Sequence, residues 1–217
     1  TRPLKGVRVV EFSHMVMGPR CGLVLADLGA DVVKVEPAPD GDKTRRLPGS
    51  GAGFFGTYNR NKRSISVNLK SVEGLEFATN LVRASDVLLE NFSAGVMDRL
   101  GLGYDAMQEI NPSLVYCALK GFLSGPYEQR AALDEVVQMM GGLAYMTGPE
   151  GHPLRAGASV NDVMGGLFGV IAIQAALLER QRTGKGTLVR SGLFENNVFL
   201  VAQHMVQYRQ TGVPAAP

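Results

Sequence analysis

The sequence contains no tryptophan, two cysteines, three histidines and almost no net charge. Cys21 and Cys117 lie in apolar surroundings, so we expect buried thiols of a reducing compartment and no disulfide framework. Lys and Arg number 22 against 20 Asp and Glu, without the basic excess that is typical of nucleic-acid-binding proteins. The histidines lack the spacing of metal ligands. The composition therefore argues against a nucleic-acid binder and a metal site.

Long hydrophobic runs are also missing. The longest apolar stretch, 167–178, contains Gly169 and Gln174 and is shorter than the roughly 20 residues that a membrane-spanning helix needs. The first residues lack the apolar segment of a signal peptide. We therefore expect a cytoplasmic protein that binds neither membrane nor nucleic acid. The turn-rich end, 211–217, resembles a connector, so we expect the chain to be part of a longer protein.

Hydrophobic residues make up 45% of the 217 residues, which is enough to bury a core. Short apolar runs alternate with helical patterns in the first part of the chain, and this alternation predicts an α/β fold on a Rossmann-like, doubly wound parallel sheet. The predicted strands are residues 7–12, 31–36, 64–68, 86–90, 114–120 and 187–190. The predicted helices are residues 20–28, 71–84, 134–146, 163–181 and 194–210.

Residues 37–59 are rich in glycine, proline and charge, so we expect a long functional or mobile loop. Gly51, Gly53 and Gly56 match the G-x-G-x-x-G pattern of dinucleotide sites. That pattern must follow a strand directly and open a helix, and residues 45–48 do not form a strand pattern, so a flexible glycine loop is favoured. Basic residues in and after this segment could bind phosphates or form a solvated surface; they are Lys43, Arg45, Arg46, Arg60, Lys62 and Arg63.

Asp162 lies at the start of a predicted helix. The helix dipole and free N–H groups there would lower the pKa of a carboxylate and keep it ionised, which suits a nucleophile. The same position describes an ordinary helix cap, and the residues alone favour the cap. His14 follows the first strand, where doubly wound folds bind ligands.

Several blocks occur in the order found in one protein family: residues 4–12, 18–19, 25–36, 59–65, 90–92, 95–102, 147–148, 157–162 and 183–186. Together they resemble the class III CoA-transferases, the CaiB/BaiF-like family of formyl-CoA and carnitine CoA-transferases. The resemblance implies the first half of an interlocked fold. Residues 1–190 would form the CoA-binding α/β domain, and 191–217 a helix and connector toward a small second domain that this chain lacks. Full-length relatives imply an interlocked homodimer.

The resemblance also implies a reaction. Asp162 matches the aspartate that attacks an acyl-CoA thioester, and CoA then passes to a free carboxylic acid through aspartyl intermediates. Asp134 would have a supporting catalytic role. Coenzyme A is a substrate here, and neither a permanent cofactor nor a metal is implied. The positions that match CoA contacts are His14, Val16, Met17, Pro37, Val67, Leu69, Lys70, Asn91, Phe92, Ser93 and Arg99. Pro37 stands where some relatives have arginine.

Three alternatives stay open. An α-methylacyl-CoA racemase-like enzyme would carry a histidine base immediately before the acid at position 134, but Leu133 stands there, which favours the transferase. A non-catalytic CoA-binding subunit of a hetero-oligomer would bind CoA without using Asp162. A nucleotide-binding oxidoreductase is disfavoured by the context of the glycine motif.

Overall fold

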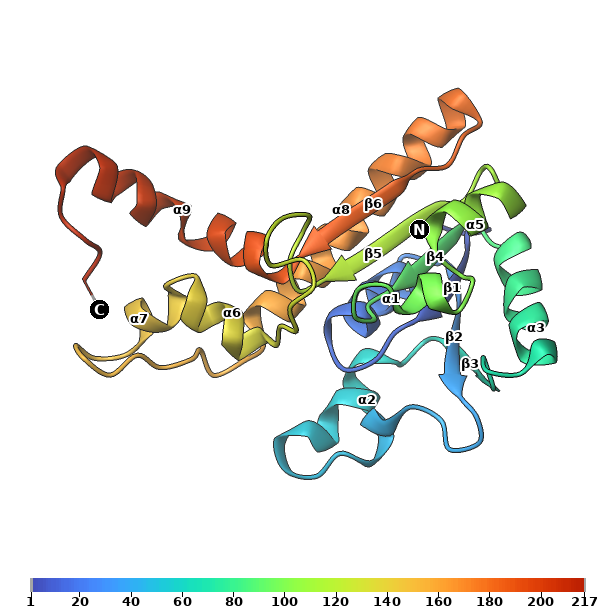
Figure 1. The fold of residues 1–217 in the computed structure, drawn as a ribbon, viewed down its shortest axis with the longest axis horizontal. Helices are drawn as coiled ribbons and strands as arrows, with labels where there is room; N and C mark the ends of the chain where they lie inside the picture. The colour runs from blue at the N-terminus through green and yellow to red at the C-terminus, as the bar shows by residue number, and fades with distance from the viewer. Residues whose placement is uncertain (1, 217) are drawn as a thin grey trace.

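A computed structural model describes residues 2–216 and contains a six-stranded sheet with helices on both faces (Figure 1). The strand order is β3-β2-β1-β4-β5-β6, and every neighbouring pair is parallel. The strands are β1 (Arg8–Phe12), β2 (Asp31–Pro37), β3 (Arg63–Val67), β4 (Val87–Glu90), β5 (Val115–Lys120) and β6 (Leu188–Gly192). The predicted doubly wound parallel sheet is confirmed.

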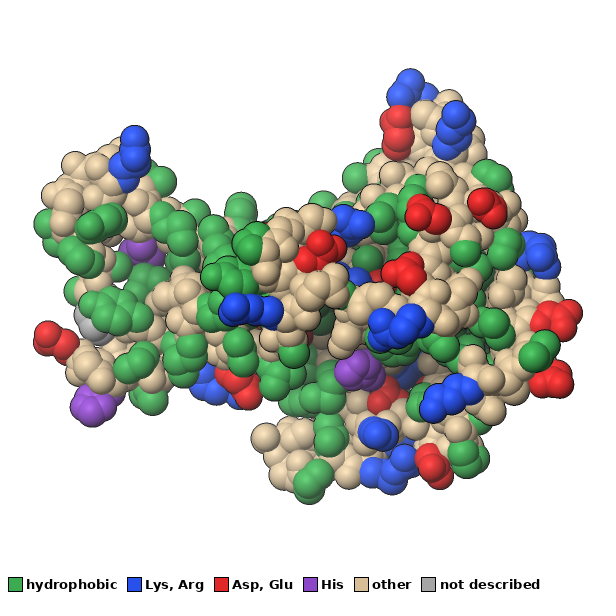
Figure 2. Space-filling model, in the orientation of Figure 1, with side chains coloured by type: hydrophobic (Ala, Val, Ile, Leu, Met, Phe, Trp, Pro, Cys, Tyr) green, Lys and Arg blue, Asp and Glu red, His purple; other side chains and the backbone are tan. Residues whose placement is uncertain are grey.

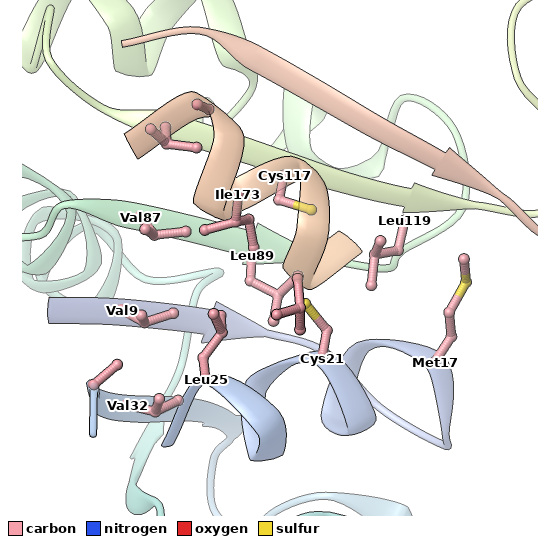
Figure 3. Close-up of a cluster of buried hydrophobic side chains, with 14 of the residues drawn as sticks. Val9, Met17, Cys21, Leu25, Val32, Val87, Leu89, Cys117, Leu119 and Ile173 are labelled. Carbon is pink, nitrogen blue, oxygen red and sulfur yellow. The ribbon is translucent and has the colours of Figure 1, made fainter. Parts of the chain in front are cut away.

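Two apolar cores lie on opposite faces of the sheet, because successive strand residues point to opposite sides. In β1, Val9 contributes to the core under α1 (Met17–Asp27) and α8 (Val160–Thr183). Val10 contributes to the core under α3 (Val72–Arg83) and α5 (Tyr104–Ile110). Figure 3 shows the first core, in which Cys21 and Cys117 lie as buried free thiols, as predicted.

Helix α8 packs closely on α1 because the facing positions are glycines. A Cβ on Gly166 would lie 2.8 Å from the carbonyl oxygen of Met17, and one on Gly169 would lie 2.9 Å from Leu119 Cδ2. By length and composition α8 could cross a membrane, but a core helix passes the same test, and 44% of its apolar window is buried. Packing against α1 and the sheet accounts for its apolar sequence.

The segment between β2 and β3 is not the open glycine loop that the sequence predicts. It contains the 3-10 helices η1 (Lys43–Arg46) and η2 (Gly49–Gly53), followed by α2 (Phe54–Tyr58). Asp42 caps η1 by accepting a hydrogen bond from Thr44 N at 2.8 Å, and the Arg45 guanidinium lies 3.8 Å from the centroid of the Phe55 ring. The three motif glycines belong to η2 and α2, and not to the turn between β1 and α1 that a dinucleotide motif would occupy.

The single helix predicted for 134–146 is wrong. The structure has α6 (Asp134–Met140) and α7 (Leu143–Thr147), because Gly142 adopts a left-handed φ of +87° between them. The first helix begins at residue 17 instead of 20, since Pro19 is tolerated in the first turn, where a missing N–H breaks no helical hydrogen bond. The remaining helices are α4 (Val96–Arg99) and α9 (Leu193–Thr211). The domain boundary expected at residue 190 falls inside β6.

Helices α6, α7 and α9 form an arm that projects from the sheet (Figure 1). Hydrophobic side chains gather on the visible surface of this arm (Figure 2). The large exposed apolar residues of its helices are Val136, Met139, Met140, Tyr145, Phe199, Leu200, Met205, Val206 and Tyr208.

Candidate active site

The sheet changes winding direction between β1 and β4. From β1 the chain proceeds outward to β2 and β3, and from β4 it proceeds to β5 and β6 on the other side. Ligands of doubly wound folds bind beyond the carboxyl ends of the strands at such a point. The loop after β1 carries His14, Val16 and Met17, and the loop after β4 carries Asn91–Ser93. The fold therefore brings these two groups of predicted residues together.

Direct contacts join the two loops. The backbone N of His14 donates to Asn91 Oδ1 at 3.0 Å, and Asn91 Nδ2 donates to the His14 carbonyl at 2.9 Å. The His14 and Phe92 rings stack with centroids 5.9 Å apart. Desolvation by the surrounding protein lowers the pKa of His14, which favours the neutral imidazole. The two rings together form an aromatic surface beside the two loops.

The other predicted contact positions lie on the same edge of the sheet. Pro37 and Val67 are register partners at the ends of β2 and β3. Leu69 and Phe92 pack against the second core, to which Val67 also belongs. Lys70 and Arg99 are exposed. Val16 and Met17 are buried.

A buried charge cluster (Glu11, Lys34, Asp42 and Lys62) supports the loop after β1. Lys34 Nζ lies 3.1 Å from Asp42 Oδ2, and Lys62 Nζ lies 2.9 Å from Glu11 Oε2. Lys34 Nζ also donates to the Ser13 carbonyl at 2.5 Å. Burial lowers the pKa of Lys62. The charges alternate, so each buried ion has an opposite partner.

This cluster reaches Met15, a non-glycine residue with a left-handed φ of 63°. Met15 N donates to Thr44 Oγ1 at 3.3 Å, and the Thr44 hydroxyl donates to Asp42 at 2.6 Å. The sequence prediction did not include these residues. A lysine inside the apolar run of β2 and a glutamate inside that of β1 were the available signal, since parallel pairing places Glu11 beside Lys34.

Most of the predicted basic cluster is already neutralised by carboxylates. Arg45 binds Glu36 through two hydrogen bonds of 2.7 Å. Burial alone would raise the pKa of Glu36, but hydrogen bonds from Arg45 and Ser64 hold it at about 2. Arg60 pairs with Asp27, Arg63 with Asp31, and Lys62 with Glu11. These four cations are thus paired with carboxylates, and they tie the 37–63 segment to α1 and the sheet.

Asp162 lies in the first turn of α8, but it is not the cap. Ser159 occupies the N-cap position, without a side-chain cap bond. The backbone N of Asp162 donates instead to Asp134 Oδ2 at 2.9 Å. A carboxylate from α6 thus satisfies one of the free N–H groups at the start of α8. The cap interpretation of the sequence is wrong, because α8 begins at Val160 and Asp162 lies inside its first turn.

The expected lowering of the Asp162 pKa is also wrong. Burial raises the pKa of Asp162 to about 7, and the nearby Asp134 and Glu135 carboxylates act in the same direction. Burial and like charge together outweigh the helix start. Near pH 7 the group therefore divides between its neutral and ionised forms.

The Asp134 carboxylate is itself buried and fully engaged. Asp134 Oδ1 accepts from Gln138 Nε2, one helical turn later in α6. Gln138 Oε1 accepts from Ala156 N at 2.7 Å. The sequence prediction included Asp134 and missed Gln138, although the spacing of four residues placed both on one helix face.

The start of α8 lies close to the loop after β1. A Cβ on Gly165, three residues after Asp162, would lie 2.4 Å from Met17 Cε and 2.9 Å from Asn196 Nδ2. Ser191 Oγ donates to the Gly165 carbonyl at 3.1 Å. The glycine contacts thus place the carboxylate pair (Asp134 and Asp162) beside the loop that carries His14, Val16 and Met17.

The chain belongs to CoA-transferase family III, which its sequence matches over residues 4–217. It is 38% identical over 224 residues to succinate–glutarate CoA-transferase of Agrobacterium fabrum, covering 98% of this chain and 56% of that protein. It is 46% identical over 193 residues to formyl-CoA:oxalate CoA-transferase of Streptomyces coelicolor, covering 87% and 47%.

A solved structure has the same fold. The CAIB/BAIF family protein from Brucella suis superposes with a TM-score of 0.92 at 41% identity, covering 99% of this chain and 59% of that one. The chain therefore spans about half the length of the curated relatives it matches.

Proposed function

We propose that this chain forms part of an enzyme that moves coenzyme A from an acyl-CoA to a free carboxylic acid, with Asp162 as the nucleophile. The observation that carries the proposal is the position of Asp162. It is a partly buried carboxylate whose backbone N–H binds Asp134, and it lies beside the β1–α1 loop in a chain of CoA-transferase family III.

The proposed chemistry consists of acyl transfers without a net change in protons. The Asp162 carboxylate attacks the thioester carbonyl carbon, the C–S bond breaks, and CoA thiolate leaves. The thiolate attacks the aspartyl carbonyl of the resulting anhydride, which releases the donor acid as a carboxylate and leaves an aspartyl-CoA thioester. The acceptor carboxylate repeats these two steps in reverse and restores Asp162. Covalent catalysis divides one difficult transfer into easier ones, and only ionised Asp162 can begin it.

Coenzyme A would bind along the carboxyl ends of the central strands. The stacked His14 and Phe92 rings offer an aromatic surface for a base, and exposed Lys70 and Arg99 offer charge for phosphates. The relatives suggest formyl, oxalyl, succinyl and glutaryl groups as first candidates for transfer. The interlocked homodimer and the cytoplasmic location expected from the resemblance are part of the same proposal.

The decisive experiment is intact-protein mass spectrometry on the full-length gene product. The protein is incubated with formyl-CoA or succinyl-CoA and then with oxalate or glutarate. We expect a CoA thioester adduct that maps to Asp162 and disappears in Asp162→Asn. Asp105→Asn is the matched control, because Asp105 is an exposed acid in the first turn of α5.

Each alternative predicts a different outcome. CoA binding without an adduct, together with exchange of the hydrogen α to the thioester in heavy water, would establish the racemase-like activity. Leu133 before Asp134 argues against that result, because it supplies no base. Binding that is unchanged in Asp162→Asn, with neither adduct nor exchange, would identify a non-catalytic subunit.

A further inference from the structure

Gln138 has a fully buried side-chain amide that forms hydrogen bonds with Asp134 and with the segment just before α8. Its relative exposure is 0%. Its nitrogen donates to Asp134 Oδ1 and, at 3.5 Å, to the Ala158 carbonyl. Its oxygen accepts from Ala156 N at 2.7 Å. A side-chain amide suits this place, because its nitrogen donates two hydrogen bonds while its oxygen accepts another.

These side-chain hydrogen bonds connect α6 to the segment 156–158. Ala156 and Ala158 belong to the irregular stretch between α7 and α8, and Asp134 and Gln138 belong to α6. The stretch enters α8 immediately before Asp162, whose N–H donates to the other oxygen of Asp134. Gln138 therefore binds two elements next to Asp162. One is the segment 156–158 that leads into α8, and the other is the Asp134 carboxylate, which accepts from the backbone N–H of Asp162.

We infer that Gln138 is a positioning residue of the proposed transferase: it fixes the Asp134 carboxylate and the segment 156–158, and through them the place and protonation of Asp162. This inference rests on the proposed function of Asp162. Gln138 touches no substrate in this role and acts only through its neighbours.

The charged surroundings of Asp162 make the role measurable. Asp134 and Glu135 of α6 oppose its ionisation. Arg155, in the preceding segment, pairs with Glu135 at 3.1 Å. Arg20 of α1 packs against α8 at Gly166, and Glu195 of α9 is engaged by Leu123 N at 3.1 Å. A further negative charge at position 138 would act in the same direction as Asp134 and Glu135 and raise the pKa of Asp162 further.

The test compares Gln138→Glu and Gln138→Leu in the full-length protein, with Gln108→Leu as the matched control on an exposed turn of α5. Adduct formation is followed between pH 5 and 9, and hydrogen–deuterium exchange is followed in peptides covering 154–163. We expect both variants to lower the maximal adduct rate at least about 10-fold, because buried polar partners lose their bonds, with little change in KM for the donor. Exchange in 154–163 should rise in both.

Only Gln138→Glu should move the midpoint of the pH profile upward, since only it adds charge beside Asp134. A purely structural role would lower the rate of both variants without this difference. Unchanged exchange, or an unchanged adduct rate, would overturn the inference. If Gln138→Leu does not fold, the midpoint of the Gln138→Glu variant decides. A wild type that forms no adduct would overturn the proposed function, and the exchange data would then decide separately whether Gln138 holds the segment.

Discussion

Two groups of ionisable side chains, the buried charge cluster and the carboxylate pair, are built in opposite ways. In the buried charge cluster beneath the β1–α1 loop, lysines alternate with acids, and each ion faces an opposite charge. In the carboxylate pair, acid faces acid, and the bonds to Asp134 come from uncharged donors. The first arrangement gives each charged group a nearby partner of opposite sign. The second holds Asp162 near the middle of its titration, where a small change in surroundings changes its charge.

The largest expected effect is a loss of stability when one cation is removed from the buried charge cluster. Lys34→Met should lower the free energy of unfolding by about 3–5 kcal/mol, because it leaves Asp42 buried without its cation and Glu11 with Lys62 alone. Denaturant unfolding measures this loss. Arg60→Met is the control: it removes an ion pair whose partners are 60% and 37% exposed, and such pairs contribute below about 1 kcal/mol. Equal losses in the two variants would contradict the comparison.

The second effect has the opposite sign. The pKa of Asp162 is higher in the folded chain than in the unfolded chain, so the folded state loses stability as pH rises from about 4 to 7. Asp162→Asn removes this cost and should stabilise the protein above pH 7 by up to about 4 kcal/mol, with little effect at pH 4. Thermal unfolding at both pH values tests it, with Asp105→Asn as control. If Asp162→Asn were less stable than the wild type at pH 8, burial and the neighbouring acids would not disfavour the ionised Asp162 side chain.

The third effect concerns the pH profile. Adduct formation needs the Asp162 carboxylate, so its rate should rise with pH through about 7. Asp134→Asn removes one opposing charge and should lower that midpoint by about one pH unit. Glu135→Gln should shift it less in the same direction, because its side chain is 49% exposed and water screens it. A midpoint that stays in place would show that burial alone sets the pKa.

The smallest expected effect on stability comes from the Arg45–Glu36 pair, which lies next to the buried charge cluster. Arg45→Met removes the main partner of Glu36, whose pKa of about 2 lies below its ordinary value. The stabilisation from this pair is present above about pH 4.5 and is lost as pH falls toward 2. Because Arg45 is 39% exposed, we expect a loss of about 1 kcal/mol at pH 7 and a smaller one at pH 3. Urea unfolding at both pH values measures the difference.

The sequence predicted the framework well and the electrostatics poorly. Apolar runs such as Val87–Leu89 determine a buried strand wherever it pairs, and Ser71 caps α3 as its residue type predicts, accepting from Gly74 N at 3.1 Å. The pairing of Lys62 with Glu11 joins residues 51 positions apart, and no local pattern reports it. The predicted pKa of Asp162 had the wrong direction because burial in the fold and acids from another helix, Asp134 and Glu135, both raise it.

The glycine face of α8 limits which mutations the proposed site could tolerate. At Gly166 the backbone of α8 lies against the backbone of α1, since a Cβ there would lie 2.8 Å from the Met17 carbonyl oxygen. An alanine at this position would push the start of α8, and Asp162 with it, away from α1. In the proposed transferase, the separation between the nucleophile and the β1–α1 loop would therefore be set largely by the main chain.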